Sequence, residues 1–88
     1  MNIYISGKSV WVFDRSSVKV QTTVDDIAVD VYVSVEALQD HFGGGTGNQA
    51  VNAYTANQGT INGVIEDIVR SGRAEPDGVY IVRSSDFE

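Results

Sequence analysis

The glycine-rich segment Gly43–Gly47 is the part of this sequence that comes nearest to a ligand-binding motif. Backbone N–H groups of such a loop, placed at the start of a helix, can cradle a phosphate or another anion. The chain would then bind a small anionic molecule through Gly44, Gly45 and Gly47, with His41 beside them. No Lys-Ser or Lys-Thr pair follows the glycines, so the phosphate loop of common nucleotide-binding proteins is absent. The alternative, which we favour, is a flexible link between two helices.

His41 is the only histidine and follows Asp40 directly. It could serve as a general base or as a metal ligand, but a metal needs further ligands at a recognisable spacing, and the sequence supplies none. A catalytic triad would also need a nucleophile that the sequence does not identify. We therefore interpret His41 as a residue at a helix C-terminus that interacts with the helix dipole. The sequence predicts no catalytic residue, no metal site and no cofactor.

The element that positions these residues is predicted from a change of hydrophobic period. Apolar residues alternate over 27–33, which is typical of a half-buried strand, and recur at helical spacing over 35–42. Ser34 lies at the junction and is a good helix N-cap, and Gly43 suits the helix C-terminus. The chain is therefore expected to pass directly from a strand into a helix.

The remaining segments show the same two periods. We predict a short extended segment at 3–5, a strand at 10–13 that is covered on both faces, strands at 18–24 and 79–82, a second helix from about 48 to 71, and a frayed tail over 84–88. Turns are predicted at residues 7–9, at Asp25-Asp26 and at residues 75–78. They form one domain over residues 1–88, ordered as three strands, two helices and a final strand. Such an order predicts an α+β fold of two layers, an antiparallel sheet with its helices packed on one face.

The predicted second helix has an apolar side that is expected to cover the sheet. The residues on this side are Ala50, Tyr54, Ile61, Val64, Ile65 and Ile68. Asn57 lies among them, and a buried amide must be hydrogen-bonded. We predict that its side chain ties the helix to a strand or to a loop backbone, and the alternative is a polar group that lines a pocket.

Small residues lie on the opposite side of this helix. Ala56, Gly59 and Gly63 could allow a close helix contact between two copies of the chain, although small residues spaced in this way promote association reliably only in membranes. We predict a monomer, with a homodimer through these three residues as the alternative.

The composition limits the possible partners. The 88 residues carry a net charge of −6, and the six basic residues are scattered along the sequence, which does not predict a nucleic-acid-binding protein. There is no cysteine and no apolar run long enough to cross a membrane. We expect a cytoplasmic protein without a membrane segment, whose partner, if it has one, is another protein.

Two sets of residues carry a resemblance to a known family. The first is Val33–Leu38 followed by Asp40–Gly43, and the second is Ala56-Asn57 with Ile61, then Gly72–Glu75 and Pro76–Val79. In their order and spacing the chain resembles the small bacterial proteins grouped as domain of unknown function 1488, over Val10 to Asp86. The resemblance implies a small two-layer α+β domain of bacterial origin. It implies no activity and no catalytic residues.

These observations predict a small binding or regulatory module without catalytic activity. The alternative is a binder of small molecules or anions, or a minor enzyme, that uses Gly43–Gly47 together with Asp40 and His41.

Overall fold

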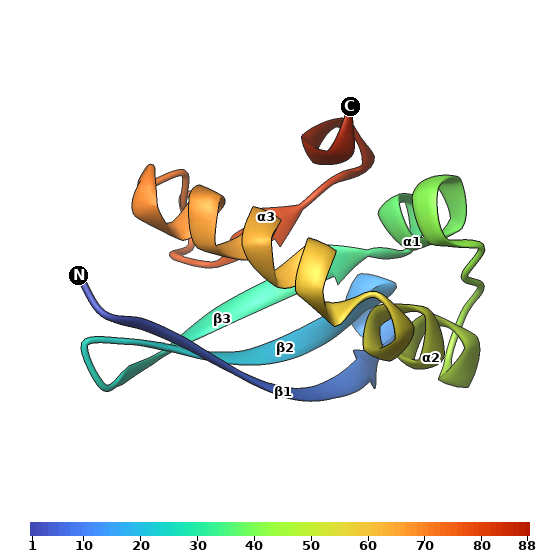
Figure 1. Ribbon diagram of the computed structural model, residues 1–88, viewed down its shortest axis with the longest axis horizontal. Coiled ribbons are helices and arrows are strands. Elements are labelled where there is room, and N and C mark those ends of the chain that lie inside the picture. Colours follow the sequence, from blue (N-terminus) through green and yellow to red (C-terminus); the bar gives the residue numbers. More distant parts are fainter.

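A computed structural model describes all 88 residues and shows an α+β fold of one four-stranded sheet and three α-helices (Figure 1). The elements in chain order are β1 (Ile3–Val12), the 3-10 helix η1 (Phe13–Arg15), β2 (Ser17–Val24), β3 (Ile27–Ser34), α1 (Val35–Phe42), α2 (Asn48–Ala56), α3 (Gln58–Arg70), β4 (Tyr80–Val82) and the 3-10 helix η2 (Ser84–Phe87). The predicted strand-to-helix junction is confirmed, because Ser34 Oγ accepts a hydrogen bond from the Ala37 N–H at 3.2 Å.

The sheet has the order β1-β2-β3-β4. β1 pairs with β2, and β2 with β3, in antiparallel fashion, whereas β4 runs parallel to β3. The prediction of a purely antiparallel sheet is therefore wrong, and the sheet is mixed. The reason is the long connection between β3 and β4, because its helices return the chain to the end of the sheet where β3 begins.

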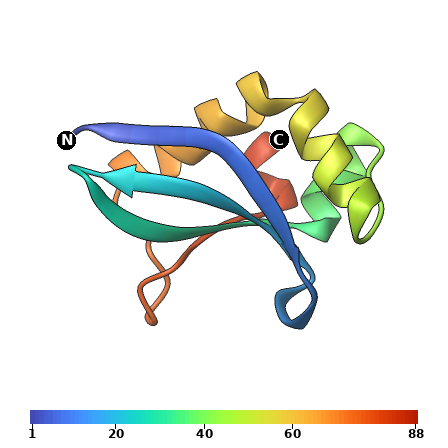
Figure 2. The same cartoon turned by 90° about the horizontal axis from the view of Figure 1, so that it is seen from below.

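All three α-helices lie on one face of the sheet, as predicted (Figure 2). The core between the two layers contains 14 buried residues. The sheet contributes alternate side chains such as Val18, Val20, Val31 and Val33, all fully buried. From α3, the residues Ile61, Ile65, Ile68 and Val69 are buried against them. None of these helices combines the length and the apolar character that a membrane span requires.

β1 is one strand of ten residues, and not two segments separated by a turn. The expected turn at Gly7 is a bulge inside the strand, because Gly7 has a φ of +83° and the register with β2 shifts between Ile5 and Ser9. The expectation that residues 10–13 are covered on both faces is also wrong, since Val10 is 56% and Phe13 83% exposed. No helix packs on the outer side of this part of the sheet.

The predicted helix from 48 to 71 is broken at Asn57 into α2 and α3. Asn57 has a φ of −126°, outside the helical range, and its side-chain amide donates to the Ala53 carbonyl at 2.8 Å. The amide is thus hydrogen-bonded as expected, but within its own preceding helix and not to a strand or loop. Asparagine favours such local bonds to the backbone, and they compete with helix continuation.

The tail over 84–88 is folded and not frayed, because η2 packs on α1. His41 Nε2 lies 3.0 Å from the Ser84 carbonyl oxygen, and the rings of Phe42 and Phe87 meet edge to face at 5.1 Å. Asp86 Oδ2 also accepts from the Arg83 N–H at 2.8 Å. The contacts of His41 and Phe42 with η2 join residues more than 40 positions apart, so no local pattern could predict them.

Two predicted turns are confirmed. Asp25 and Asp26, with φ values of 51° and 70°, form the two-residue connection between β2 and β3. The Gly78 N–H donates to the Glu75 carbonyl at 2.8 Å, which closes the turn before β4.

Candidate functional site

The candidate site is the face of the sheet that no helix covers, here called the open face (Figure 2). One row of paired residues crosses all four strands on this side and consists of Val10, Lys19, Tyr32 and Ile81. Each alternates with a core residue on its own strand, so the open face follows from the period of two in the strands.

Large apolar side chains are exposed on and beside the open face. Tyr4 is 63% and Val10 56% exposed, and Phe13, in η1 at the end of β1, is 83% exposed. Figure 2 shows that the loop containing η1 and the connection before β4 both extend on the side opposite the helices. The open face is therefore bordered by two projecting loops, and its exposed apolar side chains are of the kind that mark interaction sites.

A first hollow of about 430 Å³ lies on the open face beside the bulge of β1. Its charged residues are Lys8, Lys19 and Asp30. Lys19 Nζ is 3.1 Å from Asp30 Oδ1, and this hydrogen bond and the charge of Asp30 raise the pKa of the Lys19 ammonium above its usual value. Within this hollow Lys19 is thus paired with Asp30, whereas Lys8 makes no ion pair.

A second hollow of about 690 Å³ lies at the other end of the open face, where β3 meets α1. It is lined by Arg15, Ser17, Tyr32, Ser34, Glu36, Ile81, Arg83, Ser84 and Ser85. Two guanidinium groups, one carboxylate and several hydroxyls thus surround a floor made by Tyr32 and Ile81.

Arg15 is held across the open face. Its guanidinium carbon lies 4.5 Å from the centre of the Tyr32 ring, and Nη2 is 3.4 Å from Asp77 Oδ2 in the turn before β4. Ser16, with a φ of 46°, ends η1 and starts the return into β2. The cation over the ring covers Tyr32, which explains why a residue on the helix-free side is buried.

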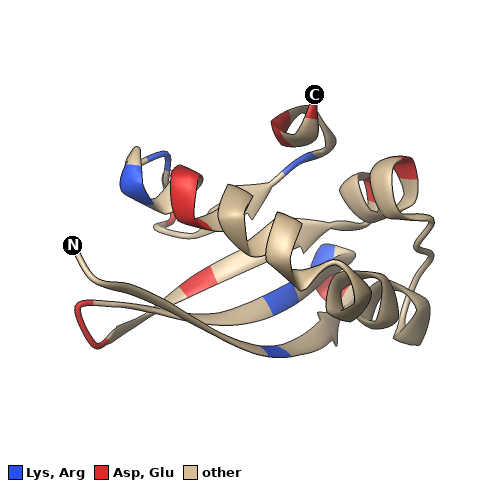
Figure 3. Cartoon of the chain, viewed as in Figure 1, with Lys and Arg blue, Asp and Glu red and all other residues tan.

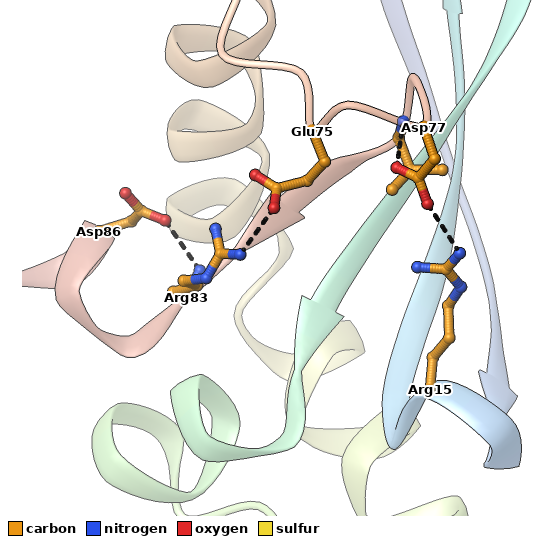
Figure 4. A network of polar contacts seen from close by, with 6 residues as sticks. Arg15, Glu75, Asp77, Arg83 and Asp86 are labelled. Atoms are coloured by element: carbon orange, nitrogen blue, oxygen red, sulfur yellow. Dashed lines mark hydrogen bonds and ion pairs between the residues drawn. The ribbon is translucent and has the colours of Figure 1, made fainter.

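Arg83 is held from the same turn. Its Nη2 donates to Glu75 Oε1 at 3.0 Å, and this hydrogen bond and charge raise the pKa of Arg83 (Figure 4). Glu75 and Asp77 therefore each hold one arginine of the second hollow.

The two hollows concentrate the positive charge of an acidic chain. Four of the six basic residues line them (Lys8, Lys19, Arg15 and Arg83), but only two of the twelve acidic ones do (Asp30 and Glu36). Figure 3 shows acidic residues on α1, on α3, on η2 and at the β2–β3 hairpin. The basic residues, which look scattered in the sequence, are gathered by the fold.

The comparisons with known proteins identify the family. The sequence pattern of the family described as "Protein of unknown function (DUF1488)" matches residues 6–82. This chain belongs to the DUF1488 family. Its fold also matches a crystal structure of a protein of unknown function from the DUF1488 family of Shewanella loihica PV-4, with a TM-score of 0.84 and 16% sequence identity over 93% of this chain and 94% of that one. No curated protein matches the sequence.

The glycine-rich link of this DUF1488 protein lies at the far end of the helical layer. A Cβ on Gly44 would come within 3.0 Å of Ala53 Cβ and 3.1 Å of Leu38 Cβ, so this glycine allows α1 and α2 to approach. Gly45 lies against the Gln49 side chain, and the Gly47 carbonyl accepts the first hydrogen bonds of α2. None of Gly44, Gly45 and Gly47 lines a hollow.

His41 and Asp40 contact η2 and not the glycine link. The Ser84 hydroxyl donates to Asp40 Oδ2 at 2.7 Å, and His41 Nε2 lies 3.1 Å from the same hydroxyl oxygen. A serine nucleophile would donate to the histidine, with the acid on the other ring nitrogen. Here the hydroxyl proton points to the acid, so the three residues attach η2 to α1.

The small residues proposed for a dimer contact are exposed in this DUF1488 protein. Ala56, Gly59 and Gly63 lie on the solvent side of the helices, and a Cβ on Gly59 or Gly63 would meet nothing within 4 Å. The monomer stays our prediction, and the homodimer through these residues stays its alternative.

Proposed function

We propose that this DUF1488 protein is a non-catalytic binding module that takes an acidic segment of another protein on the open face of its sheet. The observation that carries the proposal is the combination on one helix-free face of exposed apolar residues, represented by Tyr4 and Val10, with four of the six basic residues. Apolar contact supplies affinity and the cations select the partner.

The shape of the face supports a protein partner over a small molecule. Small-molecule sites are concave pockets that enclose most of their ligand, whereas both hollows here are open to solvent. An extended segment that crosses the strands would enter both hollows and pass over Val10 between Lys8 and Lys19.

The charge supports an acidic partner over a nucleic acid. Three of the four cations in the hollows already have a carboxylate within 3.4 Å, namely Arg15, Lys19 and Arg83. A phosphate backbone needs many uncompensated cations, and the chain as a whole carries a net charge of −6. A protein segment with a few spaced carboxylates carries less negative charge than a phosphate backbone, so fewer unpaired cations are needed to bind it. We further propose a bacterial protein of the cytoplasm, consistent with a sequence without cysteine.

The test uses a fluorescent oligoglutamate peptide with the full chain, and oligolysine and oligothymidylate as comparators. We expect the oligoglutamate to bind at low salt and to shift the backbone amide resonances of the open-face strands. Val10→Asp should weaken this binding, whereas Thr60→Asp, which adds the same charge at an exposed position of α3, should have a much smaller effect.

Three outcomes would overturn the proposal. They are no binding of oligoglutamate, tighter binding of oligothymidylate, or equal effects of the two substitutions. Shifts confined to Gly43–Gly47 and His41 would instead support the alternative of an anion binder at the glycine link. Circular dichroism of both variants verifies that they are folded.

A further inference from the structure

We propose that Arg15 and Arg83 form a carboxylate-binding subsite in the second hollow, where Asp77 and Glu75 are internal competitors for the carboxylates of the partner. This inference rests on the proposed function, because it specifies how an acidic segment is held at one end of the open face. It is tested by substitutions that the proposed function alone does not require.

The two guanidinium groups have unused donors. A guanidinium carries five N–H donors, and bidentate pairing with a carboxylate uses two of them. Arg15 bonds Asp77 through Nη2 alone at 3.4 Å, and Arg83 bonds Glu75 through Nη2 alone at 3.0 Å. Neither pair is bidentate, so each guanidinium has N–H groups left to donate to a second carboxylate, or it can exchange its present carboxylate for another.

The arginines are positioned before any ligand arrives. The Tyr32 ring supports Arg15 from below, and the turn that carries both acids joins directly to β4, which pairs with β3. Figure 4 shows that each guanidinium group faces its acid, Arg15 toward Asp77 and Arg83 toward Glu75. Arg15 therefore loses little side-chain freedom when a ligand binds, because Tyr32 still supports it after Asp77 has been replaced.

The internal carboxylates are weak partners. Both ion pairs are at the surface, and exposed ion pairs contribute little to stability because water screens them. A carboxylate of the partner can therefore replace Asp77 or Glu75 at small cost. Glu36 lies in the same hollow and repels anions, which favours an extended segment with one carboxylate here over a compact anion of high charge.

The test measures oligoglutamate binding by the full chain carrying substitutions of opposite expected sign. Arg15→Gln and Arg83→Gln should each weaken binding, and Asp77→Asn and Glu75→Gln should each strengthen it, by up to about fivefold, the range of an exposed ion pair. The Arg70–Glu66 pair on α3, at 2.9 Å, provides the matched controls Arg70→Gln and Glu66→Gln, which change the net charge equally but lie in the helical layer.

The sign of the acid substitutions decides the inference. If Asp77→Asn and Glu75→Gln strengthen binding more than Glu66→Gln does, they compete with the peptide. If they weaken binding or only match Glu66→Gln, the subsite is rejected. A peptide that responds to Val10→Asp but to neither arginine substitution would reject the subsite and retain the proposed function, whereas absence of peptide binding would reject the proposed function itself. The acid variants keep both arginines, so the test does not depend on whether an arginine variant folds.

Discussion

The two faces of the sheet are built from the same strands but have different physical roles. On the covered face Val18, Val20, Val31 and Val33 are fully buried by the helices. On the open face the neighbouring positions include Lys19 and Asp30, which form an exposed ion pair. The stability of the domain is therefore concentrated on one face, and the other can carry residues for recognition without loss of the fold.

The largest expected effect is on the covered face. Ile65→Ala should lower the free energy of unfolding by about 2–5 kcal/mol, because Ile65 is fully buried and its loss leaves a cavity. Val10→Ala, on the open face, should change the same quantity by less than about 1 kcal/mol, since this side chain is largely exposed. Urea denaturation of both variants measures the difference. Similar losses would show that the open face also holds the fold together.

The next effect concerns the inner side of the helical layer. Gly44→Ala should destabilise the protein by about 1–3 kcal/mol, because the new Cβ would lie only 3.0 Å from Ala53 Cβ and 3.1 Å from Leu38 Cβ, and neither Cβ can move without its helix backbone. Thermal denaturation followed by circular dichroism measures the shift. An unchanged midpoint would indicate that the glycine-rich link is loosely held, as a flexible connection would be.

A smaller effect of opposite sign is expected on the outer side of the same layer. Gly63→Ala should raise the free energy of unfolding by about 0.5–1 kcal/mol, because Gly63 lies in the interior of α3 and a Cβ there would meet no atom within 4 Å. The same denaturation experiment detects this gain. Light scattering of the Gly59→Leu variant also tests the alternative of a helix-mediated homodimer: a monomer keeps its mass, whereas a dimer through this side would dissociate.

The smallest effect is a loss of stability at alkaline pH that depends on Tyr54. This residue is fully buried, and its hydroxyl donates to Asn62 Oδ1 of α3 at 2.7 Å. Burial raises the pKa of its hydroxyl above the ordinary value of 10.0. Above pH 10.0 the unfolded chain therefore loses this proton more readily than the folded one, and stability falls as the pH rises. This loss of stability with rising pH should be smaller in the Tyr54→Phe variant. It should be unchanged in the Tyr4→Phe variant, because Tyr4 is exposed. Denaturation midpoints across the alkaline range measure this, and equal slopes in the two variants would contradict it.

Local patterns predicted those features that depend on neighbours in the chain. The strand over 27–33, the cap at Ser34, the helix over 35–42 and the turn at Asp25-Asp26 were predicted because period, capping and turn chemistry act within a few residues. The break at Asn57 had a visible signal, an asparagine within an apolar helical stripe. It was interpreted as a tertiary tie because a side-chain bond to the carbonyl four residues back gives no separate sequence signal.

The candidate site itself could not be predicted in this way. Arg15 and Arg83 are 68 positions apart, and nothing near either one indicates that both lie at one hollow. The sequence directed attention to the glycine run Gly43–Gly47 and to His41, the only histidine. In the structure the glycine run joins α1 to α2, and His41 attaches η2 to α1.

The sequence by itself determined the two-layer architecture, because the alternation of apolar and polar residues specifies which side of each strand is buried. Only the tertiary structure decided that β4 runs parallel to β3, that η2 is attached to α1, and that four basic residues share the open face. These outcomes depend on where a long connection returns the chain, and on contacts whose free energy appears only after distant segments have met.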